Sequence, residues 1–143
     1  MVGNLVTKTV DGVGIAYTYN ANDQLTVQGT TTFTYDANGN LLQKDSTTYE
    51  YDDKNRLTKV TTPTSTIEYS YDANDNRIAK VIDGATTNYL IDTNTHYAQV
   101  ISESNGGTDV HYTYGNDLIS NGGSFYLTDA LGSTRGLVDT SET

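Results

Sequence analysis

The chain has 143 residues, no cysteine and a net charge of −10, and 35% of its residues are apolar. Without cysteine it has no disulfides and no thiolate metal site, and its negative charge argues against nucleic acid and anionic membranes as partners. The longest apolar runs fall well short of a membrane span, so the sequence predicts no transmembrane helix.

The composition favours β structure over disorder. Disordered chains are poor in aromatic and β-branched residues, whereas this chain has 12 Tyr and 25 Thr. Both residue types fit a pleated, half-buried surface. Apolar residues are scarcer than the roughly 45–50% of ordinary globular proteins, so we expect much exposed sheet and no thick core.

A short motif recurs along the chain. Its clear copies are YTYNANDQLTV from Tyr17, FTYDANGNLLQ from Phe33, YEYDDKNRLTK from Tyr49 and YSYDANDNRIAK from Tyr69. A weaker copy places Asp92 in phase, and HYTYGNDLIS and FYLTDALGSTRGLVD follow as worn copies. The opening Gly3-Asn4-Leu5 is in phase with the back half of a copy. Repetition at a fixed period indicates a repeated structural unit.

Each copy is typical of a strand, a tight turn and a second strand. Residues two apart on a strand share a face, so each copy presents a one-faced aromatic pair. The Asp, Asn and Gly residues after the pair tolerate positive φ and predict a turn. The predicted aromatic pairs are Tyr17 and Tyr19, Phe33 and Tyr35, Tyr49 and Tyr51, and Tyr69 and Tyr71.

Second strands follow the turns. We expect them to contain the apolar residues Leu25, Val27, Leu42, Leu57, Ile78 and Ile82. No stretch has a sustained helical period, so the sequence predicts an all-β fold with essentially no helix. The expected architecture is a curled antiparallel meander of stacked β-hairpins, with roughly 13–15 short strands.

These residues resemble the YD-repeat (Tyr-Asp) or Rhs family, which includes bacterial Rhs toxins, insecticidal toxin-complex subunits and teneurins. The tail is similar to the start of the Rhs-associated core segment. The residues that carry the resemblance, and that we single out as the structural motif beside the aromatic pairs above, are Asp36, Gly39, Asp52, Asp72, Tyr112, Tyr114, Asp129, Gly132 and Arg135.

The resemblance implies hairpins wound into a spiralling sheet that forms a shell. We therefore expect one domain over residues 1–143, with regular repeats over 1–82 and degenerate repeats over 83–143. The implied function is a non-enzymatic scaffold segment, extracellular or at the cell surface, although the sequence shows no signal peptide. Its expected partners are the rest of a longer YD-repeat chain or further copies of itself, with no cofactor.

Two other functions stay open at this stage. Strand-edge pairing could build an extracellular filament or tube, because unpaired edges are templates for another chain. A proline at Val6 is expected to block that pairing. Alternatively, the tyrosines could stack on surface glycans in an adhesion module, although repeated pairs are more typical of packing between strands.

Three chemical interpretations compete with structural ones. The spacing of Asp36, Asn38 and Asn40, repeated at Asp72, opens some calcium loops, but the missing later ligands favour a turn. His96 and His111 have no recognisable nucleophile motif beside them, so we expect no catalytic residue and no metal site. Lysines that could form isopeptide crosslinks more simply protect sheet edges; these are Lys44, Lys59 and Lys80.

Overall fold

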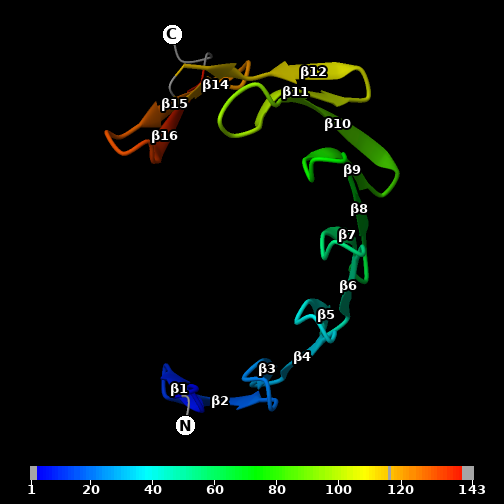
Figure 1. Ribbon diagram of the computed structural model, residues 1–143. Coiled ribbons are helices and arrows are strands. Elements are labelled where there is room, and N and C mark those ends of the chain that lie inside the picture. The colour runs from blue at the N-terminus through cyan, green and yellow to red at the C-terminus, as the bar shows by residue number, and fades with distance from the viewer. Residues whose placement is uncertain (1–2, 116, 140–143) are drawn as a thin grey trace. The chain divides into compact units, whose positions relative to one another are not determined.

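The computed structural model describes residues 3–115 and 117–139, and every regular element in them is a β-strand (Figure 1). The all-β, antiparallel prediction is confirmed. The described residues contain sixteen strands, more than the 13–15 expected. No helix in the described residues is long and apolar enough to cross a membrane.

The strands follow chain order in two sheets. The first sheet runs from β1 to β12 and the second from β13 to β16, and neighbouring strands are antiparallel. The strands of the first sheet are β1 (Thr7–Val10), β2 (Val13–Tyr19), β3 (Leu25–Gln28), β4 (Thr31–Tyr35), β5 (Leu41–Lys44), β6 (Thr47–Tyr51), β7 (Leu57–Thr61), β8 (Thr66–Tyr71), β9 (Arg77–Ile82), β10 (Ala85–Asp92), β11 (Gln99–Asn105) and β12 (Thr108–His111). Those of the second sheet are β13 (Thr113–Tyr114), β14 (Leu118–Ser120), β15 (Ser124–Thr128) and β16 (Thr134–Asp139).

The chain divides into two compact units, Met1–Glu68 and Tyr69–Thr143. The first unit contains β1 to β7 and the start of β8, and the second contains the end of β8 and the strands after it. The subdivision expected at residues 82 and 83 stays a prediction. Residues 1–2, 116 and 140–143 of that expected domain lie outside the described residues.

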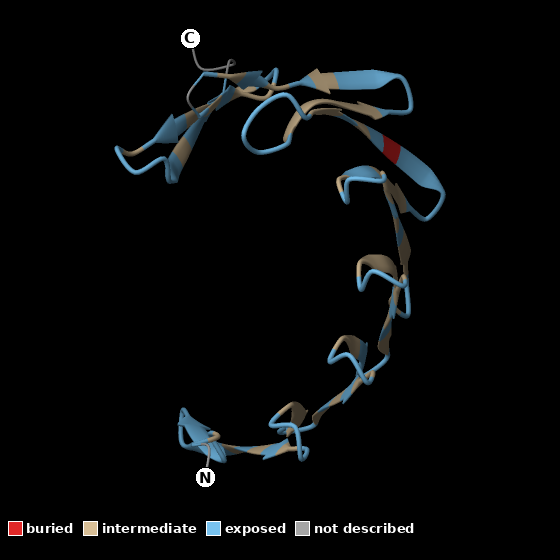
Figure 2. Cartoon of the chain, viewed as in Figure 1, coloured by how far each residue is buried: buried red, intermediate tan, exposed pale blue. Residues whose placement is uncertain are grey.

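Burial is shallow throughout the described residues (Figure 2). Thr87, at 7% exposure, is the one buried residue in that part of the chain, and no described apolar side chain is buried. Within β4 and β6 the burial alternates, so that Tyr49 and Tyr51 are half buried while Glu50 is exposed. This is the period of a strand whose two faces differ in cover. The described strands are therefore held together by hydrogen bonds between neighbouring strands and by packing among half-buried aromatic side chains.

Two kinds of turn recur along the chain. Two-residue turns join some strands, as at Asp11-Gly12 and Asp83-Gly84, where both residues have positive φ. This is the type I′ conformation, whose twist matches that of the flanking strands. Five-residue turns follow the aromatic pairs, and each of these is accompanied by a break in strand register.

The register break is a β-bulge that the sequence interpretation missed. Tyr35 lies opposite Leu41 and Thr34 opposite Gln43, so Leu42 is the extra residue. Leu41 therefore corresponds to Leu25. Leu42 lies in the second strand, as expected, but at the bulge, where it is 39% exposed. Six strand pairs contain such a bulge, and their extra residues are Thr26, Leu42, Thr58, Ile101, Ile119 and Arg135. These bulges increase the local twist of the sheet.

Candidate functional site

The repeated five-residue turn is the most regular local structure in the described chain. We call these segments the YD turns. They are Asn20–Gln24, Asp36–Asn40, Asp52–Arg56, Asp72–Asn76 and Asp129–Ser133. In each, the N–H of the first residue donates to the carbonyl of the fifth, as between Asp36 and Asn40 at 3.0 Å.

The first side chain of each YD turn organises the loop. Oδ1 of Asp36 accepts the N–H groups of Asn38 at 2.9 Å and Asn40 at 2.8 Å, and Oδ2 accepts Nδ2 of Asn40 at 2.9 Å. Asp72 makes the same three contacts with Asn74 and Asn76. The carboxylate thus accepts hydrogen bonds from N–H groups of the loop that have no partner in a neighbouring strand.

The fourth residue of each YD turn has positive φ: Asp23 at 59°, Gly39 at 91°, Asn55 at 60°, Asp75 at 69° and Gly132 at 79°. Only Gly, and with little strain Asn or Asp, adopts this left-handed conformation routinely. This explains why glycine, asparagine and aspartate interchange at the position. It also accounts for Gly39 and Gly132 as predicted motif residues.

In two copies an arginine binds the first carboxylate of the YD turn. Nε of Arg56 donates to Oδ2 of Asp52 at 2.7 Å, and a terminal guanidinium nitrogen lies 2.7 Å from the same oxygen. Arg135 repeats the arrangement with Asp129, again at 2.7 Å through Nε. The two arginines occupy different positions in their copies. Arg56 is the fifth residue of its turn, whereas Arg135 is the extra residue of the bulge that follows the turn.

Hydrogen bonds hold the pKa of three turn carboxyls below their ordinary value of 3.8. For Asp36 the main cause is the Asn40 side chain, and for Asp52 it is the backbone N–H of Arg56. For Asp129 the backbone N–H of Ser133 contributes most. In each case the folded turn stabilises the ionised form.

Consecutive YD turns contact each other. Oδ1 of Asn55 accepts Nδ2 of Asn38 at 2.9 Å and Nδ2 of Asn40 at 2.8 Å. In the same sense, Oδ1 of Asp23 accepts Nδ2 of Asn4 at 2.8 Å. In these two turns the fourth residue therefore also binds the preceding copy.

The second aromatic residue of a copy makes a further link to the preceding copy. The hydroxyl of Tyr19 donates to the carbonyl of Leu5 at 3.0 Å, and that of Tyr35 to the carbonyl of Leu25 at 2.9 Å. Tyr114 donates to the carbonyl of Val100 at 2.9 Å. Leu25 and Val100 each come directly before the extra residue of a bulge. The sequence offered one signal for this link: the second aromatic of each clear copy is always Tyr, whereas Phe33 occupies a first position.

Other predicted motif residues have individual surroundings. Tyr112 lies between β12 and β13, and its hydroxyl donates to Oε1 of Glu103 at 2.7 Å. Burial, followed by this carboxylate, raises the pKa of Tyr112 strongly. Burial also raises the pKa of Tyr114 and Tyr51. The guanidinium carbon of Arg77 lies 5.4 Å from the ring centre of Tyr69 and 5.3 Å from that of Tyr89, within cation–π range. The sequence did not predict this contact.

The residues considered for chemistry are dispersed. His96 packs its ring against Tyr97, with 4.6 Å between ring centres, and His111 lies in β12 opposite Ser102. Lys59 lies 3.7 Å from Glu68, and Lys44 lies 6.0 Å from the ring centre of Phe33. Within residues 3–115 and 117–139, no three side chains of the usual metal-binding types cluster together.

Together these features define a β-hairpin repeat protein whose copies are joined turn to turn. A family model described as teneurin YD-shell matches residues 2–143. The chain belongs to this family, as the resemblance of its Tyr-Asp copies implied. No curated protein matches the chain.

The tyrosine link can be tested without removing an aromatic ring. We expect Tyr35→Phe to lower the free energy of unfolding by about 1 kcal/mol, because the half-buried carbonyl of Leu25 loses its donor. Tyr17→Phe is the matched control, since the Tyr17 hydroxyl has a single 3.5 Å contact from Gln28. Urea unfolding followed by circular dichroism measures both changes. Equal losses in the two variants would contradict the link.

The turn carboxylates predict a loss of stability in acid. A carboxyl whose pKa is lower in the folded state stabilises the fold fully at pH values above its unfolded pKa, near 3.8. This stabilisation is lost as the pH falls through the folded-state pKa. We expect the melting temperature to decrease once the pH is below about 3.8. The variant with Asp36→Asn, Asp52→Asn and Asp129→Asn should show a shallower fall.

Asparagine is a suitable replacement because Asn20 already fills the position. Its Oδ1 accepts the N–H groups of Asn22 at 2.9 Å and Gln24 at 3.0 Å. Thermal melts from neutral pH to about pH 2 provide the comparison. An identical pH profile in the triple variant would show that other groups cause the acid transition.

Proposed function

We propose that the chain is a non-enzymatic structural segment of a YD-repeat shell that is exported or surface-associated. The observation that carries the proposal is the direct bonding of a YD turn to the preceding copy: Asn55 accepts from Asn38 and Asn40 of the preceding YD turn, and Asp23 accepts from Asn4. Such contacts extend a wall by adding copies. Membership of the teneurin YD-shell family supports the same role and an extracellular setting.

The use of the turn carboxylates also supports a structural role. Catalytic carboxylates need an oxygen available to substrate, whereas Asp36 and Asp72 each accept three hydrogen bonds from their own loops. Their residue types follow from loop geometry alone. The same logic governs repeat proteins in general, where each unit is stabilised by its neighbours and has little core of its own.

A wall built from one sheet has a measurable thickness. Paired sheets lie about 10 Å apart, so a single layer is about 10 Å thick and a sandwich roughly twice that. We expect small-angle X-ray scattering of the protein to give the thickness of a single layer. A cross-section of sandwich thickness would mean that the exposed faces are covered, and it would overturn the proposal.

Strand-edge pairing is a second candidate function, and the exposure of β1 favours it. All four residues of β1 are exposed, and β1 stands first in its sheet, with no described strand on its outer side. The predicted blocking position was wrong, however. The carbonyl of Val6 accepts the N–H of Tyr17 and so faces β2, whereas alternation along the strand turns Thr7 and Thr9 outward.

The outward groups of β1 provide the test of this pairing. We expect the protein to associate as salt screens its −10 charge, and Thr9→Pro to prevent this by removing an outward donor. Thr9→Val retains the N–H and serves as the control. Light scattering across a salt series is the measurement. Wild-type protein that stays monomeric at high salt, or association that survives Thr9→Pro, would exclude β1 as the pairing edge.

A further inference from the structure

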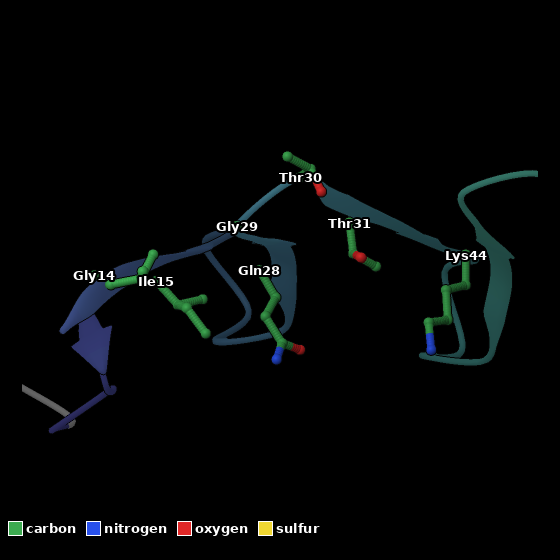
Figure 3. Close-up of a pocket in the computed structure, with 8 residues that line it drawn as sticks. Gly14, Ile15, Gln28, Gly29, Thr30, Thr31 and Lys44 are labelled. Atoms are coloured by element: carbon green, nitrogen blue, oxygen red, sulfur yellow. The ribbon is translucent and has the colours of Figure 1, made fainter. Parts of the chain in front are cut away.

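A groove of about 500 Å³ lies beside the first half of β2 (Figure 3). It forms because β2 is longer than β3: their pairing begins at Tyr17 and Gln28, and the chain then turns away through Gly29 and Thr30. The residues before Tyr17 therefore have β1 on one side and the groove on the other. Val13, Gly14 and Ile15 line the groove along this stretch.

The backbone of β2 presents hydrogen-bonding groups to the groove. The N–H of Tyr17 donates to Val6 of the β1 side, so alternate residues turn the other way, and these are Gly14 and Ala16. The carbonyl of Ala16 accepts the N–H of Gly29 at 2.8 Å. Among the described residues, no acceptor is bonded to the N–H of Ala16.

The next copy shows what completes this position. Thr32 precedes Phe33 as Ala16 precedes Tyr17, and its carbonyl likewise accepts the N–H of Asp45, at 3.0 Å. There, the N–H of Thr32 also donates to Oδ1 of Asp45 at 2.8 Å. Gly29 occupies the place of Asp45 in the earlier copy and has no side chain. The groove therefore lacks the carboxylate that Asp45 provides at the same position of the next copy.

The charge of the groove is complementary to a carboxylate. Lys44 is the one charged residue among the eight that line it. Figure 3 shows the side chains of Ile15, Gln28 and Lys44 pointing to the same side. Lys8 lies opposite Ile15 in the β1–β2 ladder and so shares its face. A basic, partly apolar strip thus runs beside the unpaired backbone of β2.

We propose that this groove binds an extended peptide of another protein that carries an acidic side chain. The peptide adds as a short strand beside Gly14 and Ala16, as in other cases of β-augmentation. Its carboxylate accepts the N–H of Ala16, as Asp45 does for Thr32. Lys44 supplies the opposite charge, and the side chains of Val13 and Ile15 contact the apolar residues of the peptide.

The probe is a capped synthetic heptapeptide that alternates valine and threonine around one central aspartate. We expect it to shift the amide resonances of Gly14 and Ala16 in a titration followed by NMR, with a dissociation constant of about a millimolar or below. The matched peptide with asparagine in place of aspartate should bind at least about tenfold more weakly, because a hydrogen bond to a charged acceptor is lost.

The decisive variant is Gly29→Asp, which supplies the missing carboxylate within the chain. Asp45 has φ of 51° at the equivalent place and Gly29 has 62°, so aspartate fits the backbone. A Cβ at Gly29 would lie 3.5 Å from Cγ2 of Ile15, an ordinary contact. We expect this variant to melt no lower than the wild type and to lose at least about tenfold in affinity for the peptide.

Lys44→Gln should weaken binding severalfold, whereas Lys80→Gln on β9 serves as a control and should leave it unchanged. Peptide binding that Gly29→Asp does not reduce would overturn the proposal, as would equal binding of the asparagine peptide. Resonance shifts confined to residues away from β2, or no shifts at millimolar peptide, would also overturn it. So would shifts that appear with protein concentration alone, because the occupant would then be a second copy of the chain.

Discussion

The rest of the structure depends on one oxygen atom in each YD turn. Oδ1 of the first residue accepts two backbone N–H groups. These two hydrogen bonds hold the loop in one tight turn, against the conformational entropy that favours a flexible loop. The turn fixes where the second strand begins, and so it fixes the bulge and the strand register. Oδ1 of Asn20 makes the same two contacts, so a neutral amide oxygen also fills the position.

The second constraint is the absence of a conventional core in the described residues. No apolar side chain there is buried, so cohesion comes from ladder hydrogen bonds, half-buried aromatic rings and links between neighbouring turns. Most of these interactions join a copy to its immediate neighbour. Stability in such an arrangement grows with the number of copies, as it does in other repeat proteins. Exposed faces and edges are then the natural consequence of the architecture.

Irregular copies are where the repeat departs from a purely structural pattern. Gly29 replaces the capping aspartate found at Asp45, and Arg77 takes the place of a leucine and lies against Tyr69 and Tyr89. The tail exposes Leu131 at 91% in a turn position that is polar in the earlier copies. A site that binds another molecule is more easily formed at such exceptions, because the regular copies satisfy their own polar groups.

The sequence by itself determined the fold class, the family and the position of the turns. Strand period and the Asp, Asn and Gly residues act locally, so Tyr35, Asp36 and Gly39 could be interpreted without any distant contact. Only the tertiary structure decided the register. It made Leu41 rather than Leu42 the partner of Tyr35, turned Thr9 rather than Val6 outward, and brought Asn55 to Asn38. These outcomes depend on how strands pair across a bulge, and a one-residue shift in pairing exchanges the two faces of a strand.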